Sequence, residues 1–158
     1  MGHSILLKSE AETVLLARIL LSKLKPSDCV LLEGPVGAGK SALARAIIQT
    51  QMELDGYKED VPSPTFTLVQ TYETSRGEFW HADLYRLSDQ SELEELGLVE
   101  ALESAISLIE WPERLAGLTP DRHLLIKLSF PDNSEHRLVT LLPSGEAWDW
   151  IEEVPFSF

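Results

Sequence analysis

Apolar residues recur at helical spacing in two stretches of the chain. After Ser9 and Glu12, which form a capping-box pattern, the apolar positions follow at intervals typical of a helix: Val14, Leu15, Ala17, Ile19, Leu20 and Leu24. We expect this first helix to end near Lys25 and Pro26, because proline cannot continue a helix. A second helix is predicted over residues 42–52, an alanine-rich stretch with one apolar face.

Short apolar runs predict the strands. Residues 29–32 and 106–109 are almost entirely apolar, which is typical of strands buried on both faces of a parallel sheet. The other strand-like runs come in two pairs, each around a polar turn: 66–72 with 78–84, and 123–130 with 136–142 around a turn over 131–134. The first of these pairs predicts an antiparallel hairpin.

The order of the elements predicts the fold class. Residues 88–102 are expected to be helical with an interruption near Gly97, and the stretch that holds Trp148 and Trp150 has helical potential. A strand, a glycine-rich turn and a helix in succession form the first half of a βαβ unit. We therefore predict an α/β fold, with a mainly parallel sheet flanked by helices and antiparallel strands added to it. No linker or repeat divides the chain, so a single domain over residues 1–158 is expected.

Composition and charge narrow the function classes. The chain has 158 residues, of which 44% are hydrophobic and 25% charged, a balance that excludes a disordered or fibrous protein. The 13 lysine and arginine residues stand against 26 acidic ones, a net charge of −13, which argues against unaided binding of RNA or DNA. The single cysteine, Cys29, and the lack of a membrane span or secretion signal favour the cytoplasm.

A glycine-rich loop is the strongest chemical signal. Residues 34–41 fit the pattern G-x-x-x-x-G-K-S, between a buried strand and a helix. The glycines let the backbone amides curl inward, and the helix directs its positive end to the same point. Nucleotide phosphates are expected on the loop residues Val36, Gly37, Ala38, Gly39, Lys40 and Ser41. Lys40 would neutralise the β- and γ-phosphates, and the Ser41 hydroxyl would face Mg²⁺. The alternative is a structural turn with a solvated lysine.

Two acidic residues are candidates to complete the site. Glu110 ends a buried strand, where ligands of open α/β sheets bind. Asp83 shares one strand face with His81 and Tyr85, which indicates either a wet cleft or the solvent face of an edge hairpin. Residues 62–65 hold two prolines before Thr65, which predicts a fixed entry into the next strand or a hydroxyl that contacts the γ-phosphate.

The combination of these segments resembles one known family. Residues 34–41, 62–66, 81–87, 95–97 and 109–113 occur together in the order and spacing of the bacterial TsaE (YjeE-type) ATPases. The likeness runs from about Ser9 to Leu142. It implies a three-layer P-loop NTPase-like fold and a role in forming N6-threonylcarbamoyladenosine at position 37 of tRNAs that read codons beginning with A.

The resemblance also implies roles for individual residues. Lys40 would hold the phosphates of ATP or ADP. Ser41 and Glu110 would bind Mg²⁺, with Asp83 as a second acid that positions water or the metal. Thr65 would report the γ-phosphate, and Thr13 and Arg137 would contact the nucleotide elsewhere.

The implied partners are the TsaD and TsaB proteins, with tRNA reached only through their complex and no contact with a membrane. Weak ATPase activity alone, stimulated by these partners, is expected, because no arginine is evidently placed to assist hydrolysis. The main rival is a small-molecule kinase, which needs an arginine-bearing lid; only Arg114 and Arg122 lie close together. A nucleotide-sensing adaptor is a third reading, and a GTPase is disfavoured because no Asn-Lys-x-Asp motif occurs.

Overall fold

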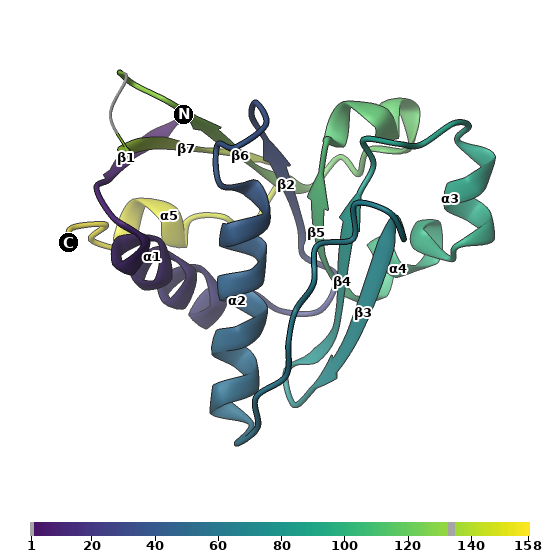
Figure 1. The fold of residues 1–158 in the computed structure, drawn as a ribbon, viewed down its shortest axis with the longest axis horizontal. Coiled ribbons are helices and arrows are strands. Elements are labelled where there is room, and N and C mark those ends of the chain that lie inside the picture. Colours follow the sequence, from purple (N-terminus) through teal and green to yellow (C-terminus); the bar gives the residue numbers. More distant parts are fainter. Residues whose placement is uncertain (1, 133–134) are drawn as a thin grey trace.

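A seven-stranded sheet in the order β1-β7-β6-β2-β5-β4-β3 organises the computed structural model, which describes residues 2–132 and 135–158 (Figure 1). The strands β6, β2, β5 and β4 are parallel, and β1, β3 and β7 pair antiparallel at the two edges. The bounds are β1 His3–Leu7, β2 Cys29–Glu33, β3 Val69–Thr74, β4 Gly77–Asp83, β5 Ile106–Glu110, β6 His123–Ser129 and β7 Arg137–Ser144. The predicted sheet is thereby confirmed.

Helices cover both faces of this sheet. The helices α1 (Glu10–Lys23), α2 (Lys40–Leu54) and α5 (Trp150–Glu153) pack on one face. On the other face lie α3 (Ser91–Glu95), α4 (Leu98–Ser104) and the 3₁₀ helix η1 (Pro112–Leu118). In the described part of the chain no helix is long and apolar enough to cross a membrane.

The central strand β2 shows why its sequence is apolar throughout. Its side chains alternate between the two cores: Val30 and Leu32 pack with α1 and α2, whereas Cys29 and Leu31 pack with α3 and α4. Burial raises the pKa of the Cys29 thiol to about 12, so this cysteine is a packing residue rather than a nucleophile. The predicted three-layer α/β architecture is therefore present.

The first helix begins as its capping box predicts. Ser9 is the N-cap residue, and its hydroxyl accepts a hydrogen bond from the Glu12 N–H at 3.2 Å. The Glu12 carboxylate accepts one from the N–H of Lys8, one residue earlier than in the usual reciprocal pair. The predicted break of the later helical stretch is also confirmed, since Gly97 is the left-handed N-cap residue of α4.

The structure departs from the sequence predictions at three strands, β1, β3 and β4. Strand β1 was not predicted; it pairs with β7 and buries Ile5 and Leu7 while Ser4 and Leu6 face outward. Strand β3 begins at Val69 instead of residue 66, because residues 65–67 form a turn and Leu68 has a φ of 68°. The predicted turn over 131–134 includes Asn133 and Ser134, which lie outside the described residues.

Strand β4 is the third departure, and it matters for the site. It pairs with β3 on one side and β5 on the other, so it is not an edge strand. His81 and Asp83 are consequently buried, with exposed fractions of 1% and 5%. The interpretation of this strand face as a solvent-exposed surface is therefore wrong.

The tip of the β3–β4 hairpin is bound to the C-terminal end of α2. The Asp55 carboxylate accepts hydrogen bonds from the backbone N–H and the hydroxyl of Ser75. Arg76 donates to Gln51 Oε1 at 2.9 Å and to the carbonyl of Leu24 at 3.2 Å. These contacts fix the far ends of two elements whose opposite ends carry Lys40 and Asp83.

Replacement of Gly34 by alanine tests the packing between β2 and β6. A Cβ atom at this position would lie 2.4 Å from the backbone carbonyl oxygen of Leu128, so the backbone must shift. We expect Gly34→Ala to lower the free energy of unfolding by about 1–3 kcal/mol, measured by urea denaturation. Gly117→Ala is the matched control, since nothing lies within 4 Å of its Cβ position. Equal stability of the two variants would contradict this account of Gly34.

Candidate functional site

The loop between β2 and α2 wraps around the amino group of Lys40. Gly39 has a φ of 104°, a left-handed conformation that favours glycine, and it is the N-cap residue of α2. The Lys40 side chain is 5% exposed, and its Nζ donates to the carbonyls of Gly34 at 2.6 Å and Pro35 at 3.0 Å. The same ammonium lies 4.4 Å from the centre of the Trp111 ring. The loop thus holds a cation at its centre with neutral acceptors only.

The charge of Lys40 is balanced between two opposing effects. Burial lowers the pKa of Lys40, and the carboxylates of Glu110, Asp83 and Glu113 oppose this shift. An anionic ligand on the loop would add to the stabilising side and supply a stronger hydrogen-bond acceptor than a carbonyl. The electrostatics of the loop therefore favour an anion beside Lys40.

Glu110 lies at the end of β5, and its carboxylate is shared between two other elements. The Ser41 hydroxyl, at the start of α2, lies 2.8 and 2.9 Å from the two carboxylate oxygens of Glu110. Nε2 of His81, on β4, lies 2.7 Å from Oε2. The Glu110 side chain is only 2% exposed, so these polar partners offset the cost of burying its charge.

Asp83 forms a second cluster beside the first. Its Oδ1 accepts the backbone N–H of Tyr85 at 3.0 Å, and its Oδ2 accepts the Thr65 hydroxyl at 3.3 Å. The Thr65 hydroxyl also lies 2.8 Å from that of Ser63. Asp83 and Glu110 are register partners of the parallel strands β4 and β5, which brings the two acids to the same end of the sheet.

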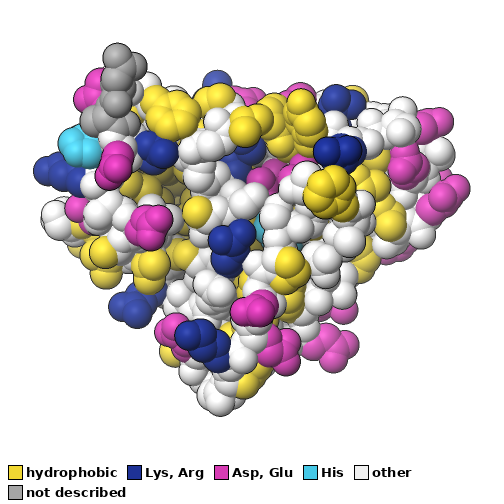
Figure 2. All heavy atoms as spheres, in the orientation of Figure 1, with side chains coloured by type: hydrophobic (Ala, Val, Ile, Leu, Met, Phe, Trp, Pro, Cys, Tyr) yellow, Lys and Arg dark blue, Asp and Glu magenta, His cyan; other side chains and the backbone are white. Residues whose placement is uncertain are grey.

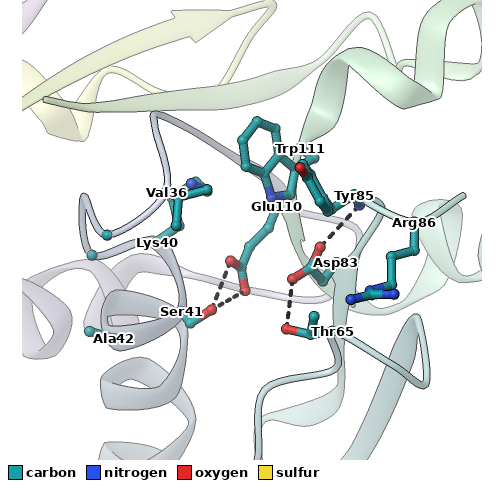
Figure 3. A pocket seen from close by; sticks show the side chains of 12 residues that line it. Val36, Lys40, Ser41, Ala42, Thr65, Asp83, Tyr85, Arg86, Glu110 and Trp111 are labelled. Atoms are coloured by element: carbon teal, nitrogen blue, oxygen red, sulfur yellow. Dashed lines mark hydrogen bonds between the residues drawn. The ribbon is translucent and has the colours of Figure 1, made fainter.

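One pocket of about 400 Å³ unites both clusters with the loop (Figure 3). Its lining contains eight of the residues predicted to form the site or to flank it: Val36, Gly37, Gly39, Lys40, Ser41, Thr65, Asp83 and Glu110. In Figure 3, the side chains of Ser41 and Glu110 point toward each other, and to the right of this pair the side chains of Thr65 and Asp83 do the same. Ala38 is set apart: its methyl group packs in the core, and its N–H donates to the carbonyl of Pro35.

The two remaining predicted residues lie on the other side of the loop. Thr13 and Arg137 line a second cavity of about 380 Å³, which shares Gly37, Gly39 and Ala42 with the first. Arg137 lies over the Phe130 ring at 4.3 Å and donates to the carbonyl of Gly37 at 3.4 Å. The loop therefore lies between two cavities, one that contains Lys40, Asp83 and Glu110 and one that contains Thr13 and Arg137.

Two side chains at the candidate site were not predicted from the sequence. His81 was seen only as a member of a polar face, and its contact with Glu110 depends on the register of β4 with β5. Arg86 lines the pocket, although the sequence placed no arginine evidently at the site. Within the described residues, no cluster of three or more His, Cys, Asp or Glu side chains could hold a metal alone.

Exposed apolar side chains surround this end of the sheet. Val36, Phe66 and Tyr85 are 77%, 81% and 50% exposed, and Phe130 is 41% exposed. Figure 2 shows apolar side chains along the upper edge of the molecule, where β2 leads into the loop. Large exposed apolar residues around a pocket are typical of a surface that contacts another molecule.

Comparison with known proteins places the chain in a family. The family model described as "Threonylcarbamoyl adenosine biosynthesis protein TsaE" matches residues 7–139. A Rickettsia felis protein named "tRNA threonylcarbamoyladenosine biosynthesis protein TsaE" is 39% identical over 143 residues, which cover 90% of this chain and 82% of that protein. A Mycobacterium bovis protein of the same name is 34% identical over 158 residues, with 94% and 88% covered.

A solved structure resembles the fold over nearly its whole length. The crystal structure of Bacillus subtilis YdiB superposes with a TM-score of 0.76 at 24% sequence identity, covering 97% of this chain and 93% of that one. The match of the family model extends over the loop, the strands β4 and β5 that carry the two acids, and the start of β7. The chain therefore belongs to the TsaE family.

Proposed function

We propose that this chain is the ATP-binding and ATP-hydrolysing component of tRNA threonylcarbamoyladenosine formation, for tRNAs that read codons beginning with A. The proposal rests on one observation above all. Two buried carboxylates from neighbouring parallel strands meet a Lys-Ser glycine-rich loop in a single pocket. Loops of this type bind nucleoside triphosphates, and acids at this position handle the metal and the attacking water.

The donor set fits Mg²⁺. A serine hydroxyl and two carboxylates are hard oxygen ligands, and Mg²⁺ in such sites takes few protein ligands beside water and phosphate. Ser41 and Glu110 would hold the ion, with Asp83 in reach of it or of its water. The ion would supply charge neutralisation at the β- and γ-phosphates. His81 keeps the Glu110 carboxylate oriented for this task.

The side chains that line the two cavities then have separate parts in binding and hydrolysis. Lys40 leaves the carbonyls of Gly34 and Pro35 and donates to the phosphates. Asp83 accepts a hydrogen bond from the attacking water and orients it, and Thr65 brings its hydroxyl to the γ-phosphate. The nucleoside occupies the second cavity, where Thr13 and Arg137 contact it.

The acidic surface fits a role within a larger assembly. With a net charge of −13, the chain is poorly suited to grip tRNA itself, so the partners TsaD and TsaB would contact the tRNA. Hydrolysis by the isolated chain is expected to be weak, because Lys40 is engaged with its own loop. We place the protein in the cytoplasm, as a single ATPase domain over residues 1–158.

The two arginines considered for the lid of a kinase, Arg114 and Arg122, are bound within the fold. Arg114 donates to the carbonyl of Leu87, and Arg122 pairs with Asp28 at 2.7 Å while stacking on Trp148. Both guanidinium groups therefore stabilise the structure instead of standing free on a lid. Release of free phosphate, rather than phosphate transfer to a metabolite, is the outcome that distinguishes the ATPase.

Removal of the Lys40 ammonium is expected to weaken nucleotide binding. Lys40→Ala removes charge-assisted hydrogen bonds to the phosphates, each worth about 1.5–3 kcal/mol, so affinity for MgATP should fall by about 10- to 150-fold. Isothermal titration calorimetry measures this directly. Lys23→Ala, at the exposed end of α1, is the control and should bind as the unchanged protein does. Absence of any heat with the unchanged chain would end the proposal.

Neutralisation of either acid is expected to separate binding from hydrolysis. Glu110→Gln and Asp83→Asn keep the shape of the side chains, and we expect ATP to bind while phosphate release falls by about 10²–10³-fold. Glu100→Gln, on the exposed face of α4, is the matched control. Phosphate release at the unchanged rate in both acid variants would contradict their assignment.

The cellular role is tested with the same variants. A strain depleted of this protein should lose threonylcarbamoyladenosine from its tRNA, and the Glu110→Gln variant should fail to restore it. The purified chain should hydrolyse ATP faster when TsaD and TsaB are added. Normal tRNA modification by a variant that binds but cannot hydrolyse ATP would instead favour a nucleotide-sensing adaptor.

A further inference from the structure

Arg86 lines the pocket, and the proposed function above gives it no role. It lies three residues after Asp83, the last residue of β4, and it lines the same pocket as Lys40 and both acids. In Figure 3 its guanidinium group points inward, toward the side of the pocket where Thr65 and Asp83 lie. Its position is therefore set by the same strand that carries the second acid.

The guanidinium group of Arg86 is not used by the fold. Across residues 2–132 and 135–158 it has neither a hydrogen bond nor an ion pair, and its contact is with the Phe66 ring, 4.7 Å away. By contrast, Arg45, Arg76, Arg114 and Arg122 all bind carbonyls or carboxylates of the fold. Arg86 keeps its planar set of donors available in a chain with twice as many acids as bases.

The negative charges at the pocket outnumber the single positive charge of Lys40. Lys40 is the other basic residue of the lining, and it stands against Asp83, Glu110 and the phosphates of a bound nucleotide. During phosphoryl transfer, negative charge spreads over the three equatorial oxygens of the γ-phosphoryl group and onto the leaving oxygen. A guanidinium group matches several of these oxygens at once, whereas an ammonium group acts as a point charge.

We propose that Arg86 is a catalytic residue, the arginine that this chain itself brings to the γ-phosphoryl group of ATP in the transition state; this rests on the proposed ATPase function. Water attacks the γ-phosphorus while its bond to the β–γ bridging oxygen breaks. ADP keeps the bonding electron pair, and the proton of the water leaves with the released phosphate. Arg86 stabilises the charge on the transferring group and takes no proton.

The Phe66 ring is the contact that holds the guanidinium group of Arg86 in this structure. Phe66 is 81% exposed and holds the guanidinium group by its ring face. It directly follows Thr65, the residue whose hydroxyl is bound to Asp83. A shift of this segment toward a γ-phosphate therefore also removes the resting contact of Arg86, so that phosphate recognition and arginine release are one motion.

The experiment compares Arg86→Ala, Arg86→Lys and the control Arg18→Ala, an arginine on the exposed face of α1. MgATP affinity is measured by calorimetry, and hydrolysis is measured in single turnovers with the chain in excess, alone and with TsaD and TsaB. Arg86→Ala should keep its affinity within about threefold while hydrolysis falls by about 10²–10³-fold. Arg86→Lys should recover less than about a tenth of the lost rate, because it lacks the planar fork.

A transition-state analogue supplies the second readout. ADP with aluminium fluoride should bind the unchanged chain more tightly than ADP alone, and Arg86→Ala should lose this gain while it still binds ADP. Hydrolysis by Arg86→Ala within about threefold of the unchanged chain, or an undiminished gain with aluminium fluoride, would overturn the proposal. Failure of the unchanged chain to bind ATP would instead refute the proposed function, so the two failures are distinguishable.

Discussion

A single buried carboxylate joins the parts of this site. Glu110 on β5 accepts hydrogen bonds from Ser41 at the start of α2 and contacts His81 on β4. A carboxylate that is 2% exposed needs such partners, since removal of its charge from water is costly. The interaction that stabilises this charge therefore also fixes the glycine-rich loop against the two acidic strands.

The arrangement depends on the parallel pairing at the centre of the sheet. Because β4 and β5 run in the same direction and are in register at Asp83 and Glu110, both acids emerge at one end. The strand β2 is parallel to β5 and delivers the loop to that same end. Lys40 and the two acids come from distant parts of the sequence. They thus meet at this end of the sheet, without a long loop that leads them into the pocket.

Local patterns carried most of the fold and the nature of the site. The apolar run at 29–32, the loop at 34–41 and the acid that ends the strand at Glu110 each signal their structure within a few residues. The edge strand at His3–Leu7 was missed because its short alternation acquires meaning only through its pairing with β7. The burial of His81 and Asp83 was uncertain for the same reason, since it depends on β3 covering the outer side of β4.

Contacts between distant segments were beyond the sequence. The inward position of Arg86 and its stacking on Phe66 follow from the place where β4 ends and from the turn over 65–67, which shortened the predicted strand. No spacing rule links an arginine at 86 to a phenylalanine at 66. The same holds for the two hollows on either side of the loop, which exist because α1 and β7 approach it from one direction and β4 and β5 from the other.

The bracing of the hairpin tip by Asp55 and Arg76 determines which parts of the molecule can respond to a nucleotide. With α2 and the β3–β4 hairpin tied together at the end remote from the pocket, a tilt of one against the other would break that tie. Within the described residues, the hydroxyl group of Thr65, in the segment between them, is bound to Ser63 and Asp83. On either side of it, the carbonyl of Val61 accepts a hydrogen bond from Arg45 and the N–H of Leu68 donates to Pro64. On the proposed function, a third phosphate would act on the surface through a local rearrangement of Thr65 and the exposed phenylalanine that follows it, while the braced scaffold stays rigid.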